Sequence, residues 1–135
     1  MTLTDTGPLI ALIDRGDKAN ITCTRQLSVL SRPLLTTWPC VSEAMHLLNN
    51  IAGHFAQDVL WSYLIDGLVE IHESAPAERA RMRELMAQYK DTPMDLADAS
   101  LVAAAEALGV RRVFTVDSDF VVYRLPGKRS FEIVP

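Results

Sequence analysis

The fold is indicated most clearly by residues 93–119, which read PMDLADASLVAAAEALGVRRVFTVDSD. Pro93 suits the first turn of a helix, and the apolar residues after it predict a helix over residues 93–108. Gly109 is a residue type often found just beyond a helix C-terminus. Residues 110–116 are rich in β-branched side chains and predict a strand. The stretch therefore predicts a helix followed by a strand that ends at the acids Asp117 and Asp119.

Helices and strands alternate along the rest of the chain. Further strands are expected at residues 2–4, 33–38, 68–72 and 131–134. Further helices are expected at residues 9–13, 18–30, 41–50, 52–66 and 76–89, with Pro39 breaking the chain before residue 41. This alternation predicts the α/β class, with a central, mostly parallel sheet of four to five strands flanked by helices in three α/β/α layers.

The length and composition fit one domain over residues 1–135, because 49% of the 135 residues are hydrophobic. No stretch approaches the roughly 18 to 20 apolar residues of a membrane span. The first residues also lack the basic and apolar segments of a secretory signal. Cys23 and Cys40 show no metal-binding spacing. Two reduced thiols in a cytoplasmic protein without a membrane partner are therefore expected.

The formal net charge of −4 argues mildly against nucleic acid as a partner. A metal site built from carboxylates adds negative charge that a bound cation offsets, so net charge does not decide the question. Basic residues also gather locally, either as solvated surface side chains or as contacts for nucleic acid. Three such groups occur: Arg79, Arg81 and Arg83; Arg111 and Arg112; and Arg124, Lys128 and Arg129.

Two acids fall where predicted strands end. Asp5 follows the strand at residues 2–4, and Asp117 follows the strand at residues 110–116. Ligands of parallel α/β sheets bind just beyond the carboxyl ends of the strands, and both acids should emerge there. Each also has a simpler explanation, since Asp5 suits a helix cap and Asp117 suits a turn. Those explanations do not account for both acids lying on the ligand-binding edge.

Asp98 is the most informative acid. The apolar residues Leu101, Val102, Ala105 and Leu108 lie three, four, seven and ten residues after it, so Asp98 shares their face of the helix. A carboxylate on such a face is costly unless it is paired, hydrogen-bonded or bound to a metal. Asp95 lies nearly one turn earlier. Asp95 and Glu43 are both also explained as acids near helix N-termini.

Oxygen ligands without a fitting His or Cys pattern favour Mg²⁺ or Mn²⁺ over Zn²⁺. If the five acids converge, they form a site for one or two such ions. A bound ion lowers the pKa of a water ligand and stabilises charge on a phosphodiester oxygen. The chemistry expected of such a site is hydrolysis of a nucleic-acid backbone.

Four segments of the chain resemble PIN-domain ribonucleases, and in particular the VapC-type toxins of bacterial toxin–antitoxin pairs. These segments are residues 3–9 (LTDTGPL), 41–44 (VSEA), 93–101 (PMDLADASL) and 113–120 (VFTVDSDF). Each segment alone is a weak signal. Their order and spacing span nearly the whole chain, which makes the combination specific. The resemblance implies a PIN-like fold and a metal-dependent endoribonuclease that acts as a toxin.

The resemblance also implies roles for individual residues. It assigns Asp5, Glu43, Asp98 and Asp117 to an acidic quartet that binds metal, with Asp95 as a supporting ligand. Thr115 is similar to the small hydroxyl residue that the family often places beside the last acid, where it helps to orient water or phosphate. Asp119 lies one residue closer than the second acid of many relatives. The implied partners are RNA, a second copy of the chain and a small antitoxin that covers the active site.

Two other functions fit parts of the sequence. A non-catalytic interaction module could keep the fold, although this chain retains all four acids. A different Mg²⁺-dependent phosphohydrolase is suggested by Asp117-Ser118-Asp119, although no Asp-x-Asp pair follows the first strand.

His46, one turn after Glu43, is more simply explained as a structural residue than as a ligand. The apolar residues 52–64 suit either the core or a partner surface.

Overall fold

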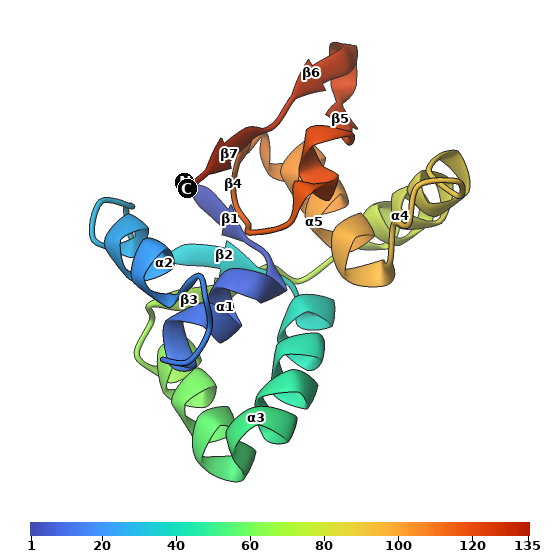
Figure 1. Cartoon of the computed structure of the whole chain (residues 1–135). Coiled ribbons are helices and arrows are strands. Elements are labelled where there is room, and N and C mark those ends of the chain that lie inside the picture. Colours follow the sequence, from blue (N-terminus) through green and yellow to red (C-terminus); the bar gives the residue numbers. More distant parts are fainter.

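The computed structural model describes residues 1–135 and contains a five-stranded, fully parallel sheet (Figure 1). The strands lie in the order β3-β2-β1-β4-β7. Their bounds are Thr2–Thr4 for β1, Leu34–Thr36 for β2, Val69–Ile71 for β3, Arg112–Phe114 for β4 and Glu132–Val134 for β7. Because β1 is central and pairs with β4, the residues that follow these two strands are neighbours at the carboxyl edge. The predicted parallel sheet is confirmed.

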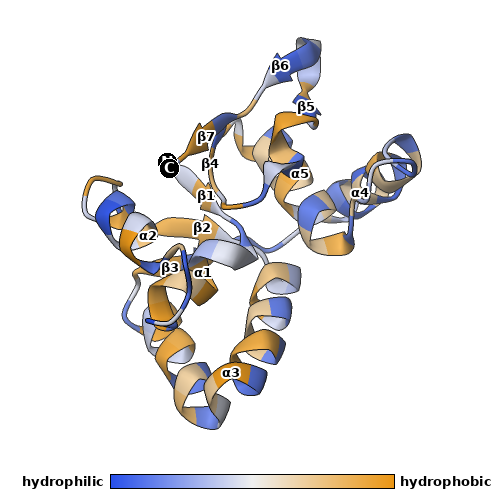
Figure 2. Ribbon diagram, viewed as in Figure 1, coloured by the Kyte–Doolittle hydropathy of each residue, from blue (hydrophilic) through white to orange (hydrophobic).

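Helices cover both faces of the sheet (Figure 1). The helices α1, α2 and α3 lie on one side and span Thr6–Ile13, Asn20–Leu27 and Trp38–Ile65. The helices α4 and α5 pack together on the other side and span Pro76–Gln88 and Leu96–Leu108. Figure 2 shows many more hydrophilic residues on α4 than on α5. The reason is that α4 is the outer helix of this pair and most of its residues face solvent. The result is the three-layer α/β/α arrangement that the sequence predicts.

Each face of the sheet has its own apolar core, because successive side chains of a strand point to opposite faces. Leu35 and Val113 pack in the core beneath α5, whereas their neighbours Leu34 and Phe114 pack beneath α1 and α3. The helix α5 is buried from Ala97 to Ala105. This burial is more extensive than a single apolar stripe requires. Leu108, which the sequence pattern places in the core, is 40% exposed at the end of the helix.

Both ends of α5 are defined by local chemistry. The helix begins at Leu96 rather than at Pro93, because the Asp95 carboxylate accepts a hydrogen bond from the Asp98 amide and caps the first turn. It ends at Leu108 and is capped by Gly109, whose φ of 66° is in the left-handed region, as the sequence predicts.

The element α3 consists of two helices that meet at a kink, which confirms the two separate helices that the sequence analysis expects. It runs from Trp38 to Ile65, with non-helical backbone angles at Ala52 and at Gly53, whose φ is 67°. The residue predicted to break the chain, Pro39, instead lies in the first turn of α3. Proline is tolerated there because a first-turn amide has no partner within the helix.

The C-terminal region contains a short hairpin that the sequence did not predict. It pairs β5 (Arg124–Leu125) with β6 (Arg129–Ser130) and projects away from the sheet (Figure 1). A 3₁₀ turn at Ser118–Val121 precedes it. Cys23 and Cys40 are both free and buried. None of the helices combines the length and the apolarity that crossing a bilayer requires.

Candidate active site

A cavity opens beyond the carboxyl ends of β1 and β4, and all five predicted acids line it. They are Asp5, Glu43, Asp95, Asp98 and Asp117. They come from four places in the fold: the end of β1, the second turn of α3, the first turn of α5 with its cap, and the segment after β4. No Lys, Arg or His lines the cavity. The acids that are widely separated in the sequence therefore meet in one strongly acidic hollow.

Asp5 is fixed by hydrogen bonds of its amide and of both its carboxylate oxygens. Its amide donates to the Phe114 carbonyl at 2.9 Å, which joins the ends of β1 and β4. One carboxylate oxygen accepts from the Thr6 amide at 2.8 Å and thereby caps α1, as the sequence suggested. The other oxygen accepts from the Thr115 hydroxyl at 2.9 Å. Burial raises the pKa of Asp5 to about 6, although the hydrogen bonds from the Thr6 amide and the Thr115 hydroxyl act to lower it. Repulsion from Asp117 and Glu43 adds to the rise.

Asp98 is as deeply buried as Asp5, with 6% of each residue exposed. Its amide donates to Asp95 Oδ1 at 2.8 Å, and its own Oδ2 lies 3.4 Å from the Asp95 amide. The two residues thus form a reciprocal cap on α5. Burial, and then repulsion from Asp95, raise the pKa of Asp98 to about 7. Asp5, the other buried acid of the cavity, adds a smaller repulsion.

Glu43 and Asp117 lie at the exposed rim of the cavity. The Thr6 hydroxyl donates to Glu43 Oε2 at 3.2 Å and links α1 to α3. Asp117 Oδ1 accepts from the Asp119 amide at 3.0 Å and caps the 3₁₀ turn. The turn chemistry expected at Asp117 is therefore present in addition to its place at the cavity. Asp119 itself does not line the cavity.

Thr115 connects the buried and the exposed parts of the site. Its hydroxyl donates to Asp5 and accepts a 3.0 Å hydrogen bond from the Asp117 amide. Only 3% of the residue is exposed. The hydroxyl therefore orients the Asp5 carboxylate and the Asp117 amide. The predicted direct contact of Thr115 with water or phosphate stays a prediction.

The cavity offers the type of ligand atom that a hard divalent cation prefers, but its carboxylates are not arranged as a closed metal cage. Every ionisable side chain that lines the cavity supplies carboxylate oxygen, and burial together with mutual repulsion makes the charged forms of Asp5 and Asp98 unfavourable without a cation. No three His, Cys, Asp or Glu side chains, however, converge closely enough to form a preformed metal cage. Mg²⁺ usually keeps several waters and is held by one or two carboxylates, so it does not need such a cage. The residues present therefore fit a hydrated ion.

Two residues of the site carry no sequence signal that would have revealed them. The hydroxyl of Tyr123, which is fully buried, donates to Asp98 Oδ2 at 3.0 Å. Thr6 reaches Glu43 as described above. Thr6 belongs to the segment 3–9 and Tyr123 lies outside all four segments, but nothing in the sequence indicates that either side chain contacts a carboxylate. Both contacts depend on tertiary structure. His46 is exposed and does not line the cavity.

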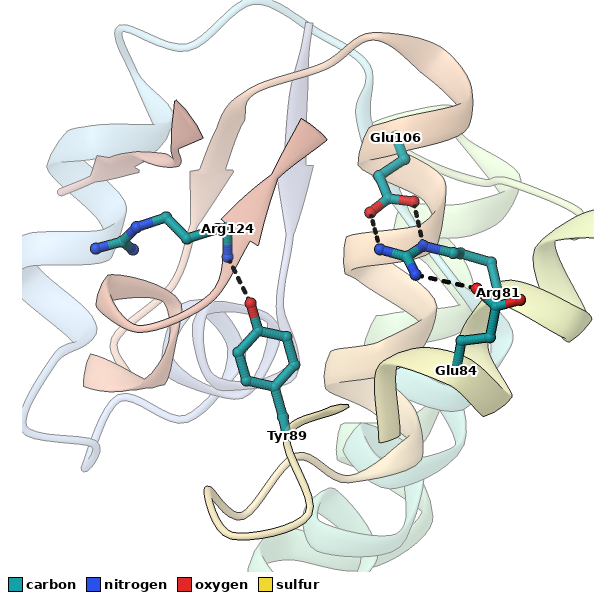
Figure 3. A network of polar contacts seen from close by, with 5 residues as sticks. All are labelled: Arg81, Glu84, Tyr89, Glu106 and Arg124. Atoms are coloured by element: carbon teal, nitrogen blue, oxygen red, sulfur yellow. Dashed lines mark hydrogen bonds and ion pairs between the residues drawn. The ribbon is translucent and has the colours of Figure 1, made fainter. Parts of the chain in front are cut away.

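Four of the basic residues noted in the sequence bind within the chain. One is Arg111, whose Nε donates to the Ser130 carbonyl at 2.7 Å. Arg81 Nε and Nη2 donate to the two oxygens of Glu106 at 2.8 and 3.0 Å, and Nη1 contacts Glu84 (Figure 3). Arg112 pairs with Glu132. The Arg124 guanidinium donates to backbone carbonyls of the preceding turn. These side chains stabilise the fold, which reduces the number of basic residues that remain free for nucleic acid.

The parallel sheet and the acidic cavity beyond its central strands define an α/β protein with a carboxylate site at the carboxyl edge. The chain belongs to the PIN domain family, which it matches over residues 2–125. It is 24% identical over 132 residues to ribonuclease VapC26 of Mycobacterium tuberculosis, which covers 97% of this chain and 98% of the relative.

A solved structure supports the same fold. The crystal structure of VapC20 of M. tuberculosis, described as a Sarcin-Ricin loop cleaving toxin, superimposes with a TM-score of 0.86. The match covers 100% of both chains at 20% sequence identity. At this identity the likeness concerns the fold. The expectation of a PIN-like fold from the four sequence segments is thereby confirmed.

Proposed function

We propose that the chain is an endoribonuclease that depends on Mg²⁺ or Mn²⁺. The observation that carries this proposal is the convergence of five carboxylates from four parts of the fold in one cavity without a basic side chain. Membership of the PIN domain family and the similarity to a protein named a ribonuclease support RNA as the substrate.

Asp5, Asp98 and Asp117 would hold the metal, with Glu43 and Asp95 contributing from the rim. A bound divalent ion supplies an acidified water and stabilises charge on a phosphodiester oxygen. Asp5 and Asp98 would bind it in their deprotonated forms, each already oriented by hydrogen bonds to the protein. Glu43 is exposed and has one carboxylate oxygen held by the Thr6 hydroxyl, so its other oxygen would be the one to orient the attacking water and accept its proton.

We also propose a biological setting for this activity. The chain would act in the cytoplasm as the toxin of a toxin–antitoxin pair, as a homodimer whose cavity is covered by a small antitoxin protein. The similarity to a toxin of known structure supports this setting. A partner surface is available on α3, where Phe55 is 77% exposed and Trp61 is 44% exposed. Residues 52–64 therefore have one face in the core, with Ala56 and Leu60 buried, and one exposed apolar face.

The central experiment compares RNA cleavage by the wild type with cleavage by Asp5→Asn and Asp98→Asn in Mg²⁺ and in Mn²⁺. Both variants should lose activity by at least about a hundredfold, because each removes a charged ligand while its shape is kept. Asp58→Asn is the matched control, because Asp58 is an exposed acid of α3 away from the cavity. Equal cleavage by all four proteins would eliminate the proposed site.

One observation favours a second function. The carboxylates do not form a preformed cage, as expected of an interaction module that kept the fold without catalysis. Titration with Mn²⁺ separates the two functions. A catalytic protein should show a saturable Mn²⁺ site that is lost in Asp98→Asn, whereas a non-catalytic module should show none. Turnover of a small phosphomonoester with RNA left intact would instead indicate a different phosphohydrolase.

A further inference from the structure

Tyr123 contacts Asp98 directly, although it lies outside every segment that suggested a metal site. Its side chain is fully buried, and its hydroxyl donates a 3.0 Å hydrogen bond to Asp98 Oδ2. Tyr123 reaches this position from the segment between the 3₁₀ turn and β5. Asp98 is thereby held from two directions, by its own helix and by the C-terminal region.

The hydrogen bonds at Asp98 distinguish its two oxygens. Oδ2 faces both the Tyr123 hydroxyl and the Asp95 amide. No donor of the chain forms a hydrogen bond to Oδ1. Oδ1 is also not completely buried, since no fully buried side-chain oxygen lacks a hydrogen-bond partner. Since Asp98 lines the acidic cavity, its uncommitted oxygen is the one available to a ligand there. The protein thus uses one oxygen to fix the carboxylate and leaves the other free.

The ring of Tyr123 is itself fixed by aromatic neighbours. It makes edge-to-face contacts with Tyr89 and Phe120, at centroid distances of 5.1 and 5.2 Å, and Phe120 packs in the same way against Phe131. Tyr89 is held in turn, because its hydroxyl accepts a hydrogen bond from the Arg124 amide at 3.0 Å (Figure 3). Such packing limits the rotation of the ring. The Tyr123 hydroxyl therefore stays where its acceptors are Asp98 Oδ2 at 3.0 Å and, at the longer distance of 3.5 Å, the Pro93 carbonyl.

We propose that Tyr123 is a positioning residue that orients Asp98 for metal binding. The inference rests on the proposed metal site and adds a residue to it. A hydrogen-bond partner behind a ligating carboxylate restricts the rotation of that carboxylate. Loss of such a partner typically lowers metal affinity by about 10- to 100-fold. Tyr123 itself has no free donor or acceptor at the cavity and does not line it, so its action passes through Asp98.

The test is Mn²⁺ affinity, measured without RNA by titration calorimetry or by electron paramagnetic resonance. Tyr123→Phe removes one hydroxyl and keeps the ring, and its Mn²⁺ dissociation constant should rise by about tenfold or more. Tyr89→Phe is the matched control, because it removes a hydroxyl from the same aromatic cluster that bonds to a backbone amide and to no carboxylate. Its affinity should equal that of the wild type.

A double-mutant cycle with Asp98→Asn separates positioning from a general loss of structure. In the Asp98→Asn background, Tyr123→Phe should cause no further loss of Mn²⁺ affinity, since the carboxylate that it orients is gone. An equal loss in both backgrounds, or wild-type affinity in Tyr123→Phe, would overturn the inference and leave the proposed metal site intact. Unchanged affinity in Asp98→Asn alone would instead overturn the metal site, and the role of Tyr123 with it.

Discussion

The Thr115 hydroxyl donates a 2.9 Å hydrogen bond to the Asp5 carboxylate and so joins residues that are 110 positions apart in the chain. The same hydroxyl accepts a hydrogen bond from the Asp117 amide. A single buried side chain therefore connects the acid after β1 to the acid after β4. This connection fixes how two of the proposed metal ligands sit relative to each other.

Replacing Thr115 by Val should weaken metal binding. The substitution keeps the branched shape but removes the donor to Asp5 and the acceptor for the Asp117 amide. We expect Mn²⁺ affinity to fall by about 10- to 100-fold, as measured by calorimetry. Thr115→Ser keeps the hydroxyl and should retain an affinity near that of the wild type. Equal affinities in Val and Ser variants would show that the hydroxyl has no part in the site.

The stability of the metal-free protein should depend on the protonation of Asp98. Burial and repulsion from Asp95 raise its pKa to about 7 from the usual 3.8. As the pH rises from about 4 to about 7, the native state keeps a proton that the unfolded chain has lost, so the free energy of unfolding falls through this range. We expect a loss on the order of a few kcal/mol, seen as a lower melting temperature in a chelating buffer.

Asp98→Asn is the control for this pH dependence, because asparagine cannot ionise. The difference in melting temperature between Asp98→Asn and the wild type should grow in favour of the variant as the pH rises from about 5 to about 7.5. Saturating Mg²⁺ should reduce that difference, since a metal binds the deprotonated carboxylate. A difference that stays constant with pH would show that Asp98 titrates normally in the folded protein.

Gly7 permits a close contact between α1 and the segment that carries Asp117. A Cβ atom at Gly7 would lie 2.5 Å from Val116 Cγ2, well inside contact distance. Gly7→Ala should therefore lower the free energy of unfolding by about 1 to 3 kcal/mol in urea denaturation and reduce RNA cleavage by displacing the rim of the cavity. Val116→Ala combined with Gly7→Ala should restore most of both properties. A stabilised single variant would contradict the contact.

The position of the acids could be predicted from the sequence because it depends on local features. Asp5 and Asp117 follow short strands, and a parallel sheet brings the ends of those strands to one edge. The helical period places Asp98 on the buried face of its helix. The sequence pattern alone places the start of α5 too early, because Pro93 and Asp95 both signal a helix start. The hydrogen bond between the Asp95 carboxylate and the Asp98 amide decides in favour of the later start.

The contacts that orient the acids could not be predicted in the same way. Tyr123 reaches Asp98 only because the segment after Asp117 turns back over α5, and that segment is a 3₁₀ turn with no detectable period. Thr115 carried a signal only through the family resemblance. Its bond to Asp5 depends on the pairing of β1 with β4, which propensities along one segment do not determine.

Arg81 tests whether the basic group on α4 serves the fold or RNA. Its guanidinium makes two hydrogen bonds to Glu106 of α5 and one to Glu84, whereas Arg83 is exposed. Arg81→Met should lower the free energy of unfolding by about 1 kcal/mol, because Glu106 loses its partner, while Arg83→Met should leave it unchanged. RNA affinity and its dependence on salt should be the same for Arg81→Met as for the wild type, since a lost phosphate contact would reduce the salt slope by about one. Filter binding of RNA over a range of salt concentrations measures both quantities. A weaker affinity with a reduced slope would assign Arg81 to the RNA surface despite its ion pairs.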